Sequence, residues 1–341
     1  RKLVLTVYVD DLLLSGPAEF HEAFWRELGR HVKIDPYEPL GRFIGRNHDV
    51  LEQTNSGRVV ALAMCDFAQD AVDQYSKLTG ITNFRNAATP FCPDGSLAPE
   101  GECQRGELHT PACAVLMKNL WLARLARPDI QKPIGDLATH ITQWSVNDDK
   151  RLHRLICYIN STKGHRLVGK VGDKPADLKL RLYVDADFEG DSDSARSTNG
   201  GFLVLYGPNT WFPIAWVTKK QTSTSRSTTE SEVVSLAYSL FQEAIPALIF
   251  WDLVLNRSMS LEILEDNQAT IKVVLKGYSP KLRHIQRTHK VDLSSIKEIL
   301  DEESVTLEYV KTDEQAADIF TKALQPSKWD HAISLLGMPT C

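Results

Sequence analysis

The sequence is poor in cysteine, and its cysteines are scattered. Among 341 residues there are six, and none belongs to a CxxC pair or is accompanied by an HxxxH pattern: Cys65, Cys92, Cys103, Cys113, Cys157 and Cys341. This pattern makes a zinc site or a disulfide scaffold an unfavoured interpretation at this length. Unpaired cysteines are typical of a reducing compartment, so we expect an intracellular protein of the cytoplasm or nucleus.

A long apolar run and an export signal are also missing. No uninterrupted apolar stretch reaches the ~18–20 residues that cross a bilayer, so we expect no membrane partner. The opening RKLVLTVYVDD is basic and then apolar, but two aspartates interrupt it and no small-residue cleavage site follows. A signal peptide is therefore not expected. Because the first residue is Arg, we expect the chain to be a piece of a longer translation product.

An overall excess of positive charge is absent as well, since 39 Lys and Arg face 44 Asp and Glu, for a net charge of −5. Two segments nevertheless concentrate basic residues, 150–174 and 276–290. Such segments can follow the phosphates of a nucleic acid. The alternative is a solvated basic face with no ligand.

Short strand and helix patterns alternate in the first half of the chain. We expect strands within 3–15, a helix over 17–30, strands near 43–44 and 59–62, and a helix over 67–78 that stops at Gly80. A Pro-, Gly- and acid-rich segment over 89–107 indicates a linker, 111–163 has a helical pattern, and 163–178 indicates a further connection.

From residue 179 the pattern changes to three strands, a helix, a strand, a helix, a strand and a helix. The strands are KLRLYVDAD, GGFLVLYG, NTWFPIAWVTK, LEILED and VTLEYV; the helices start near Ser227, Asn267, 290 and Asp313, the first running to about 255 and the last to about 324. This order predicts a mixed α/β fold in which helices flank one sheet.

Four separated carboxylates fall where an open sheet gathers functional groups, at strand ends and early helix turns. They are Asp185, Glu232, Asp266 and Asp318. If they converge, cations must compensate their charge, and hard oxygen ligands favour Mg²⁺ or Mn²⁺. Two such ions could activate a water and stabilise the leaving oxygen of a phosphodiester. The alternative is that each acid is a helix cap, a solvated strand end or a salt-bridge partner.

Four blocks of sequence resemble the RNase H domain of copia-type LTR retrotransposon Pol polyproteins, in that family's order. The blocks are YVDADFEGD with RSTNGG (183–201), WVTKKQTSTSRSTTESEVVSLA (216–237), LEDNQATI (264–271) and KTDEQAADIFTKAL (311–324). The resemblance implies an RNase H-like five-stranded mixed sheet with flanking helices. It also implies that Asp185, Glu232, Asp266 and Asp318 are catalytic metal ligands, with Glu230 as the alternative to Glu232.

The resemblance further implies a nucleic-acid contact at the helix start that holds Asn267 and Gln268, for which simple helix capping is the alternative. We expect the basic segment with Lys150, Arg151 and Arg154 to hold the backbone of an RNA–DNA hybrid. The family's RTKH segment appears here as RTHK, at 287–290, and the loop 311–317 has no histidine.

Near the chain start, YVDDLLLSG resembles the catalytic hairpin of a reverse transcriptase palm, with Asp10 and Asp11 as its paired carboxylates. LGRFIG, ATPF, RPDI and DKRLHRLICYINSTKGHRL resemble the segments that lead from the palm to RNase H. A further palm aspartate and the fingers would precede residue 1, so we expect this chain alone not to polymerise and to require the missing N-terminal part of Pol as a partner.

The resemblance divides the chain into four parts. They are a palm remnant with a thumb-like segment at 1–90, a largely helical connection at 91–178, an RNase H-like domain at 179–325 and a C-terminal tail at 326–341. The predicted function is metal-dependent cleavage of the RNA strand of RNA–DNA hybrids. The alternative is a catalytically silent binding or scaffold module. A DDE-type integrase is disfavoured because Glu232 is early and Asp318 terminal.

Overall fold

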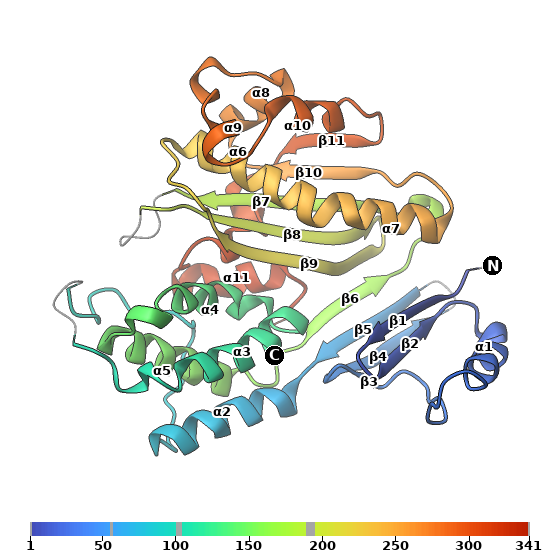
Figure 1. Ribbon diagram of the computed structural model, residues 1–341, viewed down its shortest axis with the longest axis horizontal. Coiled ribbons are helices and arrows are strands. Elements are labelled where there is room, and N and C mark those ends of the chain that lie inside the picture. The colour runs from blue at the N-terminus through green and yellow to red at the C-terminus, as the bar shows by residue number, and fades with distance from the viewer. Residues whose placement is uncertain (1, 55–56, 100–103, 189–194, 340–341) are drawn as a thin grey trace.

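A long mixed sheet organises the chain in this computed structural model, which describes residues 2–54, 57–99, 104–188 and 195–339 (Figure 1). Among these residues nine strands are joined in one sheet. In spatial order they are β11 (Val305–Tyr309), β10 (Leu261–Glu265), β7 (Lys179–Asp187), β8 (Thr198–Gly207), β9 (Thr210–Lys220), β6 (Leu167–Val171), β5 (Gly57–Ala63), β4 (Arg46–Thr54) and β3 (Arg42–Phe43).

The five strands after residue 179 form the mixed sheet that the sequence predicts. Strands β7, β8 and β9 are antiparallel neighbours, whereas β10 runs parallel to both β7 and β11. The tight β8–β9 connection comes at Pro208–Asn209, as the Gly-Pro-Asn signal predicts. The mixed α/β class is therefore confirmed. The sheet is larger than expected, because β6, β5, β4 and β3 extend it beyond β9.

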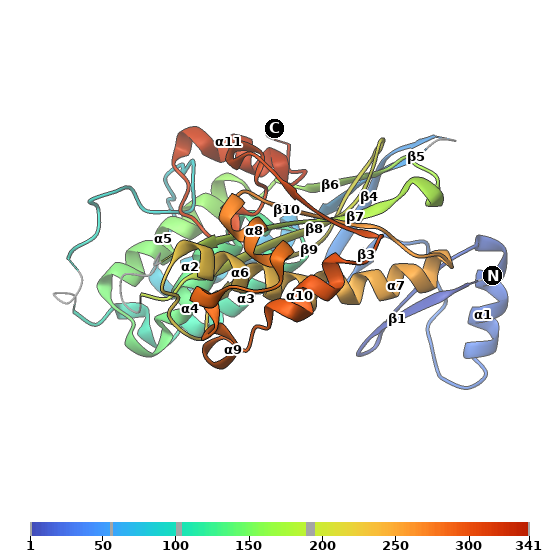
Figure 2. The same ribbon diagram turned by 90° about the horizontal axis from the view of Figure 1, so that it is seen from above.

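Helices cover both faces of this sheet. One face carries α6 (Thr228–Ser239), α7 (Ile245–Leu255), α8 (Gln268–Lys276), α9 (Ile285–Thr288) and α10 (Leu293–Leu300). The opposite face carries α11 (Pro326–Leu335), and Figure 2 shows α11 across the sheet from α6, α7 and α10. Alternation along β7 serves both cores: Leu182 and Val184 face the α6 side, and Tyr183 faces the α11 side.

A helical layer adjoins the α11 core, made of α2 (Cys65–Thr79), α3 (Ala112–Leu125), α4 (Gln131–Thr139) and α5 (Val146–Ser161). Helix α2 ends at Gly80 as predicted, with φ 72° in the left-handed region that favours glycine. A fully buried ion pair joins Arg127 Nη2 to Asp129 Oδ2 at 2.7 Å. The Tyr158 hydroxyl donates to the same carboxylate and accepts from Trp329 Nε1, which ties α5 to α11.

The N-terminal residues form a separate antiparallel hairpin, β1 (Val4–Tyr8) and β2 (Asp11–Ser15), followed by α1 (His21–Leu28). The predicted pair of strands and the following helix are thus confirmed. Tyr8 pairs with Asp11, so Val9 and Asp10 make the two-residue turn. Val9 has φ 55°, an uncommon value for a β-branched residue, and its side chain is exposed.

Several local expectations were wrong. The connection over 163–178 contains β6, because this segment gains its strand geometry from pairing with β5. Residues 46–54, for which no element was predicted, form β4 by pairing with β5 as well. The predicted helix from Asp313 to Leu324 is instead two short 3₁₀ turns, Thr312–Glu314 and Asp318–Phe320. The predicted tail holds α11, which begins with Pro326 at its first position and buries Trp329 and Ile333.

The run from α6 through a π turn (Leu240–Ala244) to α7 is also more apolar than the sequence analysis allowed. Thr228–Leu255 is long and apolar enough to cross a membrane by length and composition, since an 18-residue window within it has a mean hydropathy of 1.6. Its first part lies against β7 and β8 as a core helix does. Burial against a sheet accounts for the apolar composition of this part without a bilayer.

Candidate active site

Two parallel strands bring the first pair of acids together. Val184 on β7 is level with Glu265 on β10, so the next residues, Asp185 and Asp266, stand side by side where β10 ends. The arrowheads of both strands point to the same edge in Figure 1. Oxygens of Asp185, Asp266 and Asp318 lie within 4.8 Å of one another. The chain therefore gathers three acids that are up to 133 residues apart in sequence (318 − 185).

A glycine allows the third acid to approach. Gly200 on β8 pairs with Asp185 across the antiparallel ladder. A Cβ at Gly200 would lie 2.4 Å from Thr321 Cγ2 and 3.1 Å from the Ala317 carbonyl oxygen. Without a side chain there, the turn that carries Asp318 packs directly on the sheet. The first glycine of the GG pair in the RSTNGG motif thus has a steric reason to be glycine.

The helix α6 supplies the fourth acid from the other side. Ser227 caps the helix by accepting a hydrogen bond from the Glu230 N–H at 3.2 Å. Farther along the helix, the Ser235 hydroxyl donates to the Asp185 carbonyl oxygen at 2.6 Å, which fixes the helix against β7. Glu232 consequently lies with Glu265 and Asp266, their carboxyl oxygens within 4.8 Å of one another.

The two acid groups share Asp266, so the site contains five carboxylates in place of the four predicted. Glu265, which the sequence analysis missed, is fully buried at the end of β10. The alternation of a strand would put it on the face opposite Asp266. A glutamate directly before a predicted ligand was the signal that could have found it.

Burial and mutual repulsion dominate the electrostatics. Burial, reinforced by Asp185, Glu265 and Asp266, raises the pKa of Glu232 to about 11. Burial and the charge of Asp185 raise the pKa of Asp318 to about 7, and the same two causes raise the pKa of Asp266. These carboxyls resist ionising together unless a cation joins them.

One such cation belongs to the chain. Lys322 Nζ lies 3.0 Å from Asp185 Oδ1 and 2.8 Å from Asp318 Oδ1. Burial opposes the charge of this ammonium, but the carboxylates of Asp185 and Asp318 raise its pKa above the usual value. Thr321 donates its hydroxyl to the other oxygen of Asp185. Thr321 and Lys322 both belong to the segment that packs against the sheet at Gly200. Neither was predicted from the sequence to be a site residue.

The donor set fits a hard divalent cation. All five groups offer carboxylate oxygens, the ligands that Mg²⁺ and Mn²⁺ prefer. Glu232 Oε2 and Glu265 Oε2 are buried and accept no hydrogen bond among the described residues. Buried oxygens of this kind are costly unless a partner satisfies them. The residues present are thus suited to hold such an ion.

An open cavity of about 690 Å³ lies beside three of these acids, and its lining includes Asp185, Glu232, Asp266, Asp187, Phe188, Asn267 and Gln268. Asn267 caps α8, since its amide oxygen accepts from the N–H groups of Ala269 and Thr270. Helix capping was the alternative to a nucleic-acid contact at Asn267. Because capping occupies the amide oxygen, the predicted nucleic-acid contact can use only the amide nitrogen. Gln268 is exposed at the rim.

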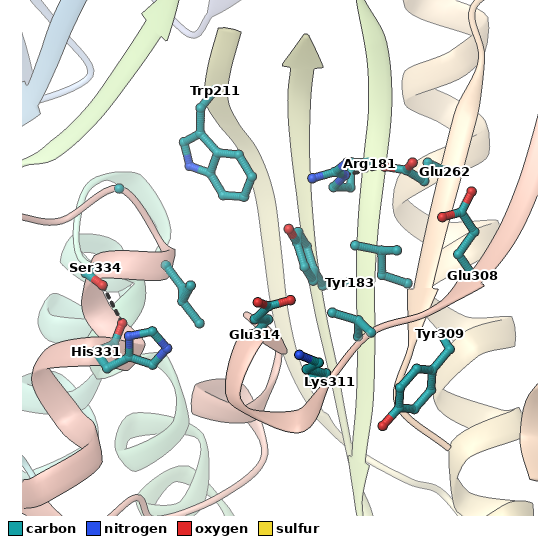
Figure 3. Close-up of a pocket in the computed structure, with 14 residues that line it drawn as sticks. Arg181, Tyr183, Trp211, Glu262, Glu308, Tyr309, Lys311, Glu314, His331 and Ser334 are labelled. Carbon is teal, nitrogen blue, oxygen red and sulfur yellow. Dashed lines mark hydrogen bonds and ion pairs between the residues drawn. The ribbon is translucent and has the colours of Figure 1, made fainter. Parts of the chain in front are cut away.

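A larger pocket, of about 810 Å³, lies on the α11 face of the sheet (Figure 3). Its lining includes Tyr183, Trp211 and Tyr309, and also Arg181 and Glu262, which form an ion pair. Ser334 donates a hydrogen bond to the carbonyl oxygen of His331 on its helical wall. Among the described residues, none of the four predicted acids lines this pocket. It is therefore separate from the acid cluster.

The three basic residues that were predicted to contact the hybrid differ in how free their side chains are to do so. Lys150 is exposed on α5. Arg151 pairs with Asp148 at 2.9 Å, and Arg154 donates to the backbone carbonyls of Thr89 and Phe91. These two guanidinium groups hold the chain itself, so they have fewer donors to offer to a phosphate. Their role on a hybrid stays a prediction.

Glu230 points away from the acid cluster. Its Oε1 lies 3.0 Å from His284 Nε2 and 3.3 Å from His289 Nε2. Asp10 and Asp11 sit at the tip of the β1–β2 hairpin, exposed to solvent, and within the described ranges they are not in either of the two carboxylate clusters. The hairpin shape agrees with the palm interpretation, whereas its role stays a prediction.

The strand order and the acid cluster agree with the RNase H-like sheet that the sequence resemblance implies. No family model matches the chain. The Pol polyprotein from transposon RE1 of Arabidopsis thaliana is 25% identical over 339 residues, covering 98% of this chain and 21% of that polyprotein. An uncharacterized mitochondrial protein of the same plant is 32% identical over 237 residues, covering 69% of this chain and 90% of that protein.

Among solved structures, LC11-RNase H1 from compost matches at 17% identity with a TM-score of 0.28, covering 42% of this chain and 92% of that one. The chain spans about a fifth of the length of the RE1 polyprotein. The resemblance to copia-type LTR retrotransposon Pol polyproteins is confirmed by such relatives, since the RE1, RE2 and TNT 1-94 polyproteins match 98–99% of this chain at 22–25% identity.

Proposed function

We propose that this chain is a metal-dependent ribonuclease H that cleaves the RNA strand of RNA–DNA hybrids within a retrotransposon reverse transcriptase polyprotein. The observation that carries the proposal is the convergence of Asp185, Glu232, Asp266 and Asp318 from four separate elements. Burying several carboxylates together costs desolvation and repulsion energy that only cations can offset. Such a cluster is therefore expected at a cation site and not at unrelated strand ends.

Asp185, Asp266 and Asp318 would hold one Mg²⁺ or Mn²⁺, and Glu232 with Asp266 would hold a second. When bound, the ions would neutralise a phosphate and make an attacking water more acidic. The hydroxyl of Thr312 donates to Asp266 Oδ2 at 2.9 Å, and that of Thr321 donates to Asp185. These bonds fix the ligand orientation before substrate arrives.

Discrimination for RNA would rest on groups at the cavity rim. Gln268 and the amide nitrogen of Asn267 are polar groups beside the acids that can contact a 2′-hydroxyl. Lys150 would contact the hybrid backbone farther away, from α5. The helix lies at the same end of the molecule as the carboxyl ends of β7 and β10 in both views (Figures 1 and 2).

The proposal extends to the setting of the enzyme. We expect the missing N-terminal part of Pol to be its partner, to complete the palm to which Asp10 and Asp11 would belong, and an intracellular location. The predicted boundaries at residues 90, 178 and 325 stay part of this proposal. Limited proteolysis that leaves a stable fragment starting near residue 179 would support the third of the four parts.

A cleavage assay tests the function. The full chain is incubated with a hybrid whose RNA strand carries an end label, with Mg²⁺ or with a chelator. We expect internal cuts in RNA only when the metal is present. Hybrid binding without cleavage would instead support the catalytically silent scaffold, and no binding would leave neither function standing.

A further inference from the structure

Lys322 places a positively charged group among the acids of the candidate site. Its ammonium contacts one oxygen of Asp185 and one of Asp318, at 3.0 and 2.8 Å. Those two acids and Asp266 form one of the two carboxylate groups that fit a divalent ion. The lysine thus faces acids that the proposed function assigns to the metal.

The contact is built by the fold and does not depend on a freely placed side chain. Lys322 follows Asp318 by four residues, and its backbone N–H donates to the Asp318 carbonyl oxygen at 3.0 Å. The neighbouring Thr321 holds the second oxygen of Asp185. The segment that contains Ala317 and Thr321 packs closely against the sheet at Gly200. The backbone of this segment therefore places the Lys322 ammonium beside the acids in the folded protein.

An ammonium and a divalent ion cannot share these oxygens without strong repulsion. Mg²⁺ binds carboxylate oxygens at about 2.0–2.1 Å, closer than any hydrogen-bonded nitrogen. Two positive charges a few ångströms apart repel strongly in a partly buried site. The lysine can withdraw, because its side chain is one-third exposed (35%) and its four-carbon stem is flexible.

We infer that Lys322 is an internal counter-cation that competes with the divalent ion for Asp185 and Asp318. It stabilises the acids before metal arrives and moves aside when the ion binds. In this way it weakens metal affinity and sets the metal concentration at which the site fills. The inference rests on the proposed function only in that the same acids are the metal ligands.

The test measures metal binding directly, by calorimetric titration of the full chain with Mn²⁺. Lys322→Met removes the charge and keeps most of the side-chain volume, and Lys322→Arg keeps the charge. Lys297→Met is the matched control, because Lys297 on α10 also pairs with an aspartate four residues away, Asp301, whose side chain is exposed and lies outside the acid cluster. Melting temperatures in chelator and in Mn²⁺ provide a second measurement and report whether each variant folds.

We expect Lys322→Met to bind Mn²⁺ about tenfold more tightly, a change worth about 1.4 kcal/mol. It should melt at a lower temperature in chelator and gain more from Mn²⁺ than the parent does. Lys322→Arg and Lys297→Met should keep the parental affinity. If Lys322→Met does not fold, Lys322→Gln takes its place with the same expectation.

Each other outcome is decisive. Equal or weaker Mn²⁺ binding by the neutral variant, with a parent that binds Mn²⁺, overturns the inference and leaves the nuclease proposal intact. Tighter binding by the variant together with no cleavage by any form supports the inference and rejects the nuclease. If neither parent nor variant binds Mn²⁺, both are wrong.

Discussion

Glu232 on α6 and Glu265 at the end of β10 bring their carboxyl oxygens within 4.8 Å of each other inside the protein. Both side chains are buried, at 4% and 0% exposure. Burial is the main cause that raises the pKa of each, and neighbouring carboxylates add to it. A pair of this kind makes the stability of the protein depend on pH and on metal.

In chelator, the free energy of unfolding should fall as the pH rises. The carboxyl of Asp318 has a pKa of about 7 in the folded protein against an ordinary value of 3.8, so it binds protons more tightly when folded. The stability that it contributes is complete below about pH 4 and is lost as the pH rises through about 7. Glu232 extends the same loss toward its folded pKa of about 11.

Denaturant titrations across this pH range, with chelator or with Mn²⁺, check the prediction. Mn²⁺ should reduce the loss, since it favours the ionised carboxylates. Asp318→Asn should flatten the dependence in chelator. A stability that rises steadily with pH in chelator over this range would contradict the assignment of raised pKa values.

Asp266→Asn should abolish hybrid cleavage, with a loss of more than about a hundredfold, because Asp266 belongs to both carboxylate groups. The fold should survive, since removing one charge relieves repulsion that already raises the pKa of this carboxyl. Cleavage rates and melting temperatures of parent and variant are compared. Asp313→Asn, at an exposed position in a nearby turn, is the control and should keep full activity.

Asp129→Asn should destabilise the protein by about 3–5 kcal/mol, because it leaves the Arg127 charge buried and without its ionised partner. Denaturant unfolding gives the value. Glu22→Gln breaks the exposed pair with Arg26 and should cost at most about 1 kcal/mol. Equal costs for the two changes would show that the buried pair does not support the α5–α11 contact.

Replacing both Asp10 and Asp11 by Asn should change neither hybrid cleavage nor the number of Mn²⁺ ions bound. The two side chains are exposed on the hairpin tip and lie in neither of the carboxylate groups found within the described ranges. Primer extension by the parent should also fail. Nucleotide incorporation by this chain, or loss of a bound Mn²⁺ ion in the double variant, would contradict this account of the hairpin.

The sequence predicted the parts of the site that depend on strand ends and helix starts. Asp185 and Asp266 follow apolar strand patterns, and Glu232 follows a serine cap, so local signals locate them. The meeting of these acids with Asp318 depends on the parallel register of β7 and β10 and on the space at Gly200. The strand register and the space at Gly200 are features of the tertiary structure, and the family resemblance was the sequence signal that indicated the meeting of these acids.

Other features had weak local signals. Strand β6 contains Gly169 and Lys170 in the sequence LVGKV, and pairing with β5 gives it its structure. Helix α11 starts at a proline that also suits a chain end. Lys322 could have been found from its spacing to Asp318, since residues four apart in a helical turn face each other.

The central claim is that the gathered acids cut RNA in a hybrid with the help of a divalent ion. The most direct measurement incubates the full chain with an RNA–DNA hybrid, a double-stranded RNA and a double-stranded DNA of the same sequence, each with Mg²⁺ and with chelator. We predict cuts in the RNA strand of the hybrid with Mg²⁺ alone. An intact hybrid in Mg²⁺, or equal cutting of all three duplexes, would contradict the claim.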